Sequence, residues 1–390
     1  AILYSGTSLT IVATNMYSGI SKFLLLAIPF FVLSGNIMAK AGISKRLIRF
    51  VNTCVGHRRG GIAIVCVIVA CFFGAISGSG PATVAALGAV LIPAMIEQGG
   101  FSAPFSAALM ATASSIAIVI PPSIAFVVYA SITGVSIGDM FMAGIVPGIL
   151  MGLALIVVVM LEVRKNHVVP SNVQKASAKE RLDAFKDAFW GFLMPVIILG
   201  GIYGGIFTPT EAAAVSVVYG LFVGMVIYKE LKLKDLLDSL IDSAKTTGGI
   251  MLIVACASLF SFVCTRFGIS AAASQLLAKV AGNQFTFLLI CNVIFLIAGC
   301  FIDANSAMYI FIPIMLPVCK ALGYNVIAFG IMATVNLAIG QVTPPVGVNL
   351  FVAIGIKLRD GIRVTLQEIS RAVVPMVAAS IVVLLIITYI

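Results

Sequence analysis

The stretches SGSGPAT (residues 77 to 83) and IDANSAM (residues 302 to 308) decide the fold of this chain. Each one interrupts a long apolar run near its middle, where polar groups in hydrocarbon are costly and usually functional. The stretches also occupy matching places, because Pro121-Pro122 follows the first one as Pro344-Pro345 follows the second. The chain therefore consists of two copies of one unit, each with one polar interruption.

Composition sets the class of protein. Of the 390 residues, 61% are hydrophobic and only 10% are charged, with a mean hydropathy of +1.17. Apolar runs of membrane-spanning length fill the chain, which indicates a polytopic α-helical membrane protein and excludes a soluble one. The first clear span is expected between about residues 22 and 39.

The charged residues and cysteines add little chemistry of their own. A net charge of +10 in a membrane protein favours basic cytoplasmic loops over a nucleic-acid partner. The eight cysteines lie scattered in apolar stretches without a C-x-x-C pair, so they predict neither a disulfide framework nor a transition-metal site. No cofactor is expected.

Each interruption predicts the tip of a re-entrant helical hairpin, over residues 60 to 97 and 284 to 318. In the first copy, the apolar halves at 61 to 76 and 84 to 96 are each shorter than the roughly 20 residues that a span needs. Short half-helices that meet at a polar tip are tolerated where the tip is buried or lines a cavity. Loop parity cannot distinguish hairpins from pairs of full spans, so this prediction depends on length and on the tips.

Each Pro-Pro pair predicts a discontinuous transmembrane helix, over residues 103 to 133 and 325 to 356. Proline cannot continue a preceding helix but suits the first turn of a new one, so the second halves are expected to begin at Pro121 and at Pro344. Smaller matches support the duplication, such as AGIS at 41 to 44 and FGIS at 267 to 270.

The predicted organisation follows from these elements. We expect an N-terminal loop or interfacial segment (1–21), a first repeat (22–161), a central part (162–247) and a second repeat (248–390). The central part should hold a basic linker, a surface helix ending near Trp190, two spans at 192–207 and 212–228, and a basic amphipathic segment at 229–245. Thr208 or Thr210 is expected to cap the second of these spans, with Glu211 at its positive end.

The basic residues predict the orientation of the chain. If each hairpin returns to the side it left, all but four of the 24 Lys and Arg residues lie on one side of the membrane. The exceptions are Lys22, Arg266, Lys279 and Lys320. The positive-inside rule makes the basic side cytoplasmic. The two hairpins then enter from opposite sides, so the repeats have inverted topology.

Inverted repeats with broken helices at mid-membrane are typical of secondary transporters. Half-helix N-termini directed inward suit an anionic substrate, and the unpaired carbonyls of the preceding halves suit a small cation such as sodium. Two repeats predict two cation sites. The candidate cation residues are Ser77, Gly78, Ser79, Ile120, Asp303, Asn305, Ser306, Gly340 and Thr343. The candidate substrate residues are Ser79, Pro81, Thr83, Ser123, Asn305, Pro345 and Asn349.

Alternatives remain open for these residues. Proton coupling needs titratable groups at depth, and Asp303 is the only acid within an apolar run, so sodium is favoured. Asp303 could instead be a helix cap held by the Ser306 N–H, and the Ser/Gly tip could serve close helix packing. An intramembrane enzyme is disfavoured because metal-protease motifs and a base at depth are lacking, with His57 and His167 both in polar loops. A channel fits two inverted hairpins less well than alternating access.

Several motifs resemble one family of transporters. The stretches SGSGPATVAALGAVLIPAM, AIVIPPS, GGIYGGIFTPTEAAAVSVVYG and TPPVGVNLF are similar to those of the large membrane subunit of tripartite ATP-independent periplasmic (TRAP) transporters, and the similarity covers nearly the whole chain. The resemblance implies an elevator-type ion-transporter fold, in which hairpins and broken helices move and the remaining spans stay as scaffold. It places family ion and substrate residues on Ser77, Ser79, Ser123, Asp303, Asn305 and Thr343.

The resemblance also implies a function. It implies sodium-driven uptake of an organic acid across the bacterial inner membrane, together with a small membrane subunit and a periplasmic substrate-binding protein. Sialic acid and C4-dicarboxylates are the leading substrate candidates, with a slight preference for sialic acid. A dicarboxylate elevator transporter that works without a binding protein is a further alternative. Since the family usually begins with one more hydrophobic helix, we expect sequence to precede Ala1.

Overall fold

The computed structural model of the chain describes residues 8, 10–165, 175–358 and 363–390. His167, Arg359 and residues 1–7 of the expected N-terminal segment lie outside these residues. Every regular element in the described part is helical, and nine helices there are long and apolar enough to cross a membrane. The expectation of an all-α polytopic membrane protein is confirmed.

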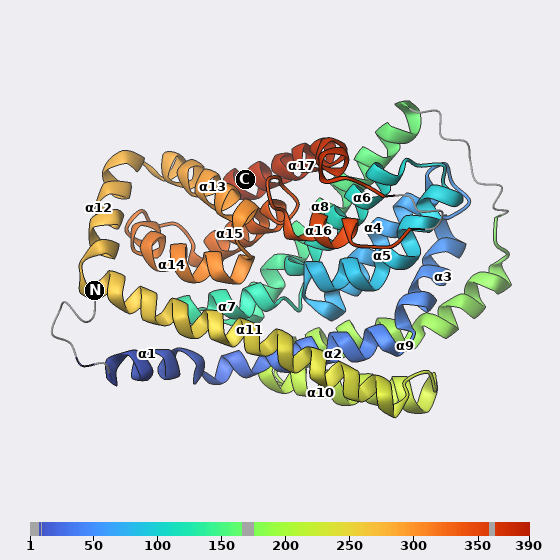
Figure 1. Cartoon of the computed structure of the whole chain (residues 1–390), viewed down its shortest axis with the longest axis horizontal. Coiled ribbons are helices and arrows are strands. Elements are labelled where there is room, and N and C mark those ends of the chain that lie inside the picture. Colours follow the sequence, from blue (N-terminus) through green and yellow to red (C-terminus); the bar gives the residue numbers. More distant parts are fainter. Residues whose placement is uncertain (1–7, 9, 166–174, 359–362) are drawn as a thin grey trace.

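One layer of the molecule consists of long helices that pack along one another (Figure 1). It contains α1 (Thr10–Ile20), α2 (Ala27–Lys40), α9 (Ala178–Tyr203), α10 (Pro209–Phe222) and α11 (Leu233–Arg266). A short 3-10 turn, η2 (Phe23–Leu26), leads into α2, and a π-helical turn, η4 (Val223–Ile227), extends α10. We call this layer the scaffold.

Three expectations about the scaffold need correction. Of the two alternatives for the N-terminal segment, the loop is wrong for residues 10–20, which form helix α1; the side chains of Thr14 and Asn15 bond back to carbonyls one turn earlier instead of competing with the helix. The surface helix near Trp190 and the next span form a single helix, α9. The amphipathic segment and the span after it likewise form one helix, α11, since Gly248 and Gly249 are tolerated within it.

The cap of α10 is as expected. Thr208 is the N-cap residue, its hydroxyl accepts a hydrogen bond from the Glu211 N–H, and the Glu211 carboxylate accepts one from the Thr208 N–H at 2.8 Å. This capping box satisfies two otherwise unpaired donors. The alternative residue, Thr210, is buried and does not cap the helix.

The two hairpins lie above the scaffold, and their tips meet near the middle of the molecule (Figure 1). The first consists of α4 (Gly61–Ser77) and α5 (Gly80–Glu97), and the second of α13 (Gln284–Phe301) and α14 (Ala304–Ala321). The four halves have 17 or 18 residues each, and those of the first hairpin are longer than the ranges expected from the sequence. The turn at each tip takes only two residues, so the helices extend into the polar stretches themselves.

Both broken helices are present. The first comprises α6 (Ala103–Ser115), a 3-10 turn η3 (Ile116–Ile118) and α7 (Ile124–Thr133), and the second comprises α15 (Val326–Gly340) and α16 (Val348–Ile354). Both Pro-Pro bonds are cis. The second halves begin at Ile124 and Val348, so the expected starts at Pro121 and Pro344 are wrong. Each proline pair lies in the bend between the two half-helices, outside the helical hydrogen-bond pattern, so the missing N–H groups are not needed there.

Two further spans differ from the expected division of the molecule. Helix α8 (Ile137–Lys165) packs against α4, α7 and α15, and α17 (Leu366–Tyr389) packs against α6, α8 and α15. These spans were expected to stay with the scaffold, yet they contact the hairpins and broken helices. We call α4 to α8 and α13 to α17 the hairpin body.

Two amphipathic helices connect the scaffold to the hairpin body. Helix α3 (Ile43–Val55) packs on α9 and α4, while α12 (Ile269–Ala281) packs on α14 and α13. Gly42 and Gly268, the matching glycines of AGIS and FGIS, precede these helices with φ of +76° and +70°. Only glycine adopts this conformation without strain, which explains why both copies have it.

Polar contacts hold α3 on the scaffold. Arg46 forms ion pairs with Asp187 at 3.1 Å and with Glu230 at 2.7 Å, and its guanidinium lies 3.7 Å from the centre of the Tyr228 ring. By contrast, α12 donates a hydrogen bond from Ser274 to the Ile314 carbonyl of α14. The two connecting helices are therefore attached to different parts of the molecule.

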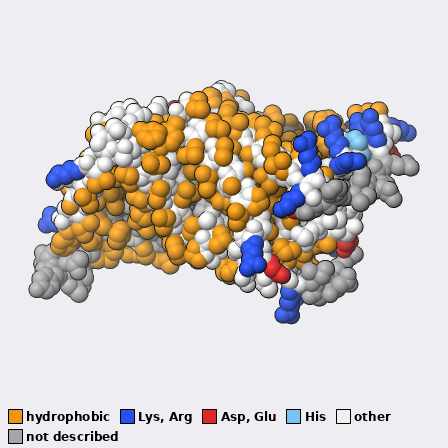
Figure 2. Space-filling view, turned by 90° about the horizontal axis from the view of Figure 1, so that it is seen from above, with side chains coloured by type: hydrophobic (Ala, Val, Ile, Leu, Met, Phe, Trp, Pro, Cys, Tyr) orange, Lys and Arg blue, Asp and Glu red, His pale blue; other side chains and the backbone are white. Residues whose placement is uncertain are grey.

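The surface agrees with a membrane location. Figure 2 shows a broad apolar band, with most of the visible Lys and Arg side chains gathered at the end that holds α3 and the C-terminus of α8. Several long helices have exposed apolar side chains, such as Val157 on α8, Val196 on α9 and Leu252 on α11.

The core of the second repeat depends on two glycines. Gly299 of α13 and Gly340 of α15 face each other so closely that a Cβ at Gly340 would lie 2.5 Å from the Gly299 Cα. Because the obstacle is backbone, no rotamer change can relieve it. The first repeat has the same arrangement, with Gly74 of α4 against the backbone of Ala117.

We predict that Gly340→Ala destabilises the protein. Overpacking of a tight site costs about 1–3 kcal/mol, which exceeds the 0.5–1 kcal/mol or so that alanine gains over glycine within a helix. The melting temperature of the purified protein should fall by several degrees. The control is Gly200→Ala on α9, where no atom would lie within 4 Å of the new methyl group. An equal effect of both substitutions would contradict the prediction.

Candidate functional site

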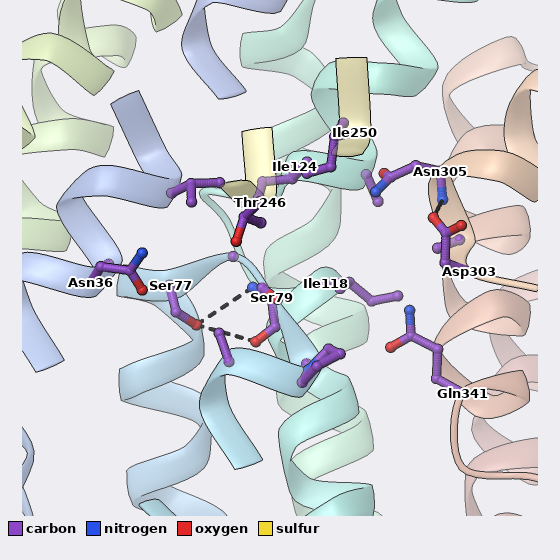
Figure 3. Close-up of a pocket in the computed structure, with 18 of the residues that line it drawn as sticks. Asn36, Ser77, Ser79, Ile118, Ile124, Thr246, Ile250, Asp303, Asn305 and Gln341 are labelled. Atoms are coloured by element: carbon purple, nitrogen blue, oxygen red, sulfur yellow. Dashed lines mark hydrogen bonds between the residues drawn. The ribbon is translucent and has the colours of Figure 1, made fainter. Parts of the chain in front are cut away.

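A cavity of about 430 Å³ lies where the two hairpin tips face the scaffold. Its walls come from both tips, from the break of each discontinuous helix, and from α2 and α11 (Figure 3). Six residues predicted from the sequence line it, namely Ser77, Gly78, Ser79, Pro81, Asp303 and Asn305. The structure therefore brings together two polar stretches that are more than two hundred positions apart in the chain.

The first tip is a compact turn built on Gly78. Gly78 ends α4 with φ of +60°, and a Cβ there would lie 2.9 Å from the Pro122 carbonyl oxygen. Only glycine combines this conformation with such a close approach. The turn therefore packs directly on the break of the first discontinuous helix.

The hydroxyl groups of this tip are partly occupied. The Ser77 and Thr83 hydroxyls are 2.7 Å apart, and Thr83 donates to the Ser79 carbonyl at 2.8 Å. Thr83 is completely buried and lies behind the tip rather than on the cavity wall. Ser79 is the N-cap residue of α5, but its side chain makes no capping hydrogen bond.

The second tip has a carboxylate at its helix start. Asp303 is the N-cap residue of α14, and one carboxylate oxygen accepts the N–H groups of Asn305 at 2.9 Å and Ser306 at 3.2 Å. The Ser306 hydroxyl also donates to Asp303. The capping role that the sequence left open for Asp303 is thus observed. Asp303 nevertheless lines the cavity, with the Asn305 side-chain oxygen buried nearby and unpaired.

The two helix starts that face the cavity are therefore unequal. Helix α14 has its positive end neutralised by its own Asp303, whereas α5 presents its first turn without a side-chain cap. Unpaired N–H groups and the helix dipole favour an anion at such an end. Of the two tips, the first is therefore better suited to bind an anion.

The remaining predicted residues lie outside the cavity wall. Ser123 is buried, caps α7 and donates to the Ile118 carbonyl at 2.5 Å, so its hydroxyl is used within the fold. Thr343 donates to the Ile339 carbonyl at 2.7 Å, and the Gly340 carbonyl accepts the Thr343 N–H. Ile120, Ser306, Pro345 and Asn349 also lie off the wall. Gly340 and Thr343, the candidate cation residues of the second broken helix, therefore do not line this cavity.

Three polar residues of the cavity wall were not predicted from the sequence. Asn36 of α2 and Thr246 of α11 belong to the scaffold, and Gln341 ends α15. Asn36 donates to Ser243 at 2.8 Å, which ties α2 to α11 beside the cavity. Gln341 lies three residues before Pro344, and its place close to the Pro-Pro pair could have indicated its role. Asn36 and Thr246 lie outside the repeats' polar stretches and gave no such signal.

The charge of the cavity is unusual for an anion site. None of the described residues that line it is Lys, Arg or His, and Asp303 is its one acid. Attraction of an anion must therefore come from helix ends, from amide and hydroxyl groups, or from a cation bound with the anion. Around these groups the wall is mostly apolar.

Comparison with known proteins gives a consistent result. The family model "Tripartite ATP-independent periplasmic transporter, DctM component" matches residues 1–390. A C4-dicarboxylate TRAP transporter large permease protein of Pseudomonas aeruginosa is 41% identical, over 100% of this chain and 89% of the relative. An isethionate TRAP transporter permease protein of Oleidesulfovibrio alaskensis is also 41% identical, over 97% of this chain and 59% of the relative. A sialic acid TRAP transporter large permease protein of Vibrio cholerae is 36% identical, over 90% and 82%.

A solved structure shares the fold. The YdaH transporter of Alcanivorax borkumensis aligns with a TM-score of 0.68 at 16% identity, covering 97% of this chain and 87% of that protein. At this identity the likeness concerns the fold alone.

Proposed function

The chain belongs to the DctM family of tripartite ATP-independent periplasmic transporters, and on that basis we propose that it carries out sodium-coupled uptake of an organic acid anion. Its role as a transporter permease, and not an enzyme, follows from the family. The coupling ion, the substrate and the movement are our proposals.

One observation carries the proposal. The cavity lies between the tips of two inverted hairpins on one side and the scaffold helices α2 and α11 on the other. A site at this boundary can be exposed to either side of the membrane if the hairpin body moves along the scaffold. This arrangement supports an elevator mechanism, in which the substrate moves together with the hairpin tips.

Sodium is the better coupling ion on chemical grounds. Proton coupling needs titratable groups at the site, and Asp303 is the one acid on the described wall of the cavity, with no histidine beside it. Carboxylate, amide and carbonyl oxygens near the tips are hard ligands that suit a small cation. A bound cation would also supply the positive charge that the described cavity wall lacks.

For the substrate we favour a C4-dicarboxylate over sialic acid. Relatives named for C4-dicarboxylates are 41% and 39% identical over 100% and 97% of the chain, against 36% over 90% for the relative named for sialic acid. This choice differs from the slight preference of the sequence analysis. The cavity volume of about 430 Å³ is compatible with either acid.

The proposal includes two protein partners and a bacterial inner-membrane location. Membership of the family implies a small membrane subunit and a periplasmic binding protein that delivers the substrate. The exposed apolar side chains of α10, including Val218 and Phe222, leave room for a membrane partner on the scaffold. The basic end of the molecule would face the cytoplasm.

We predict that proteoliposomes containing the membrane complex take up radiolabelled C4-dicarboxylate only when an inward sodium gradient and the binding protein are both present. The physical reason is that the anion needs the charge of the bound cation. Potassium replacing sodium serves as the control for ionic strength. Equal uptake driven by a proton gradient alone would exclude sodium as the coupling ion.

A further inference from the structure

Gln341 is a buried side chain with an unused acceptor. It is only 5% exposed, it lines the cavity, and its Oε1 atom has no hydrogen-bond partner among the described residues. Leaving a buried polar atom unpaired costs about 1–3 kcal/mol. Such a cost in the wall of a binding cavity indicates that a ligand supplies the missing partner.

A second unpaired amide oxygen lies beside it. Asn349 is fully buried and donates to the Ala111 carbonyl at 3.3 Å, but its Oδ1 atom also lacks a partner. A Cβ placed on Gly80 would lie 2.9 Å from the Gln341 oxygen and 3.0 Å from the Asn349 oxygen. Both amides from the second repeat therefore meet at the first residue of α5, in the first repeat.

These amides adjoin the uncapped start of α5. Figure 3 shows the Gln341 side chain directed from its own ribbon towards the region of Ser79. The α5 end offers N–H donors and a positive dipole, whereas the amides offer acceptors. A ligand that satisfies both must combine a negative group with a donor group a short distance away.

We infer that the side-chain oxygen of Gln341 accepts a hydrogen bond from a hydroxyl group of the substrate, so that the transporter prefers hydroxylated carboxylates to their deoxy analogues. The inference rests on the proposed function. The substrate carboxylate lies at the start of α5, and the substrate hydroxyl donates to Gln341 Oε1, because Gln341 is the one of the two amide residues that lines the cavity. A site built to bond a hydroxyl discriminates strongly against the analogue without it, because its own polar group is then left unpaired.

The experiment measures binding to the purified membrane complex in sodium buffer, by isothermal titration, without the binding protein. Two pairs of acids that differ by one hydroxyl are compared, L-malate with succinate and sialic acid with a deoxy-sialic acid. For the pair that binds, the wild type should prefer the hydroxylated acid by about tenfold or more. In Gln341→Leu and in Gln341→Met, which keeps the length of the side chain, the preference should fall to about onefold.

The matched control is Thr246→Val. Thr246 lines the same cavity, but its hydroxyl is already donated to the Asp242 carbonyl, so the hydroxyl preference should persist. Unchanged preference in both Gln341 variants would overturn the inference. So would equal weakening of both acids with a higher sodium requirement, because Gln341 would then be a cation ligand.

Two further outcomes separate the inference from the proposed function. Binding of both acids of a pair with equal affinity by the wild type would overturn the inference and leave organic acid transport intact. Failure of a folded wild-type complex to bind any of the four acids in sodium would overturn the proposed function, and the inference with it.

Discussion

Asp303→Asn is expected to abolish sodium-dependent uptake while leaving the fold intact. Asparagine is as good an N-cap residue as aspartate, so the N–H groups of Asn305 and Ser306 keep an acceptor. What is lost is the one negative charge on the described wall of the cavity. Loss of a charged ligand worth about 2.7 kcal/mol corresponds to a decrease on the order of a hundredfold in uptake. Initial rates in proteoliposomes, measured over a range of sodium concentrations, check this result.

Asp303→Ala separates the two roles of this residue. The alanine variant loses both charge and cap, so its melting temperature should fall, in line with a cost of about 0.5–2 kcal/mol, while its uptake should be as low as that of Asp303→Asn. If Asp303→Asn instead transports at the wild-type rate and only Asp303→Ala is impaired, Asp303 is a structural cap and not a cation ligand.

Gly35→Val is expected to block transport from the scaffold side. A Cβ at Gly35 would lie 3.1 Å from the Ser77 Cα, so helix α2 touches the backbone of the first hairpin tip. The two branches of valine enlarge this contact, and the backbone opposite cannot rotate away. We expect uptake to fall at least about tenfold, equivalent to about 1.4 kcal/mol, through a displaced tip.

The control is Gly248→Val on α11, where a Cβ meets no atom within 4 Å. Both variants introduce the same side chain into a scaffold helix, so differences in helix propensity cancel. Overpacking at Gly35 should also lower the melting temperature by a few degrees relative to Gly248→Val, so uptake is compared per amount of folded, reconstituted complex. Wild-type uptake by Gly35→Val would show that the contact between α2 and the tip is not part of the transport cycle.

Much of the fold could be predicted from sequence because the constraints of the membrane are strong. Polar stretches such as SGSGPAT must be buried within protein, and Pro-Pro pairs must end helices, so hairpins and broken helices follow from local chemistry. The exact starts of the second halves did not follow. Proline fits both the first turn of a helix and the bend before it, and only the Ser123 cap shows that the helix begins at Ile124.

The site was predicted in outline and not in detail. The two tips were recognisable because each holds polar groups where they are costly, and both line the cavity. Asn36 and Thr246 could not be found in this way, since their positions depend on how the scaffold packs against the tips. The hydroxyls of Ser123 and Thr343 show the opposite error, because side chains that look like ligands in sequence bond to nearby carbonyls.

The unequal attachment of the two connecting helices bears on how the molecule could bend. Arg46 holds α3 against α9, so a moving hairpin body would have to swivel at the far end of α3, where Gly60 has φ of +70°. Helix α12 is bonded to α14 and would move together with it. The backbone would then rotate at Gly268, between α11 of the scaffold and α12. Helix α3 would thus stay with the scaffold and α12 would move with the hairpin body. The hinge would lie after the connecting helix in the first repeat and before it in the second.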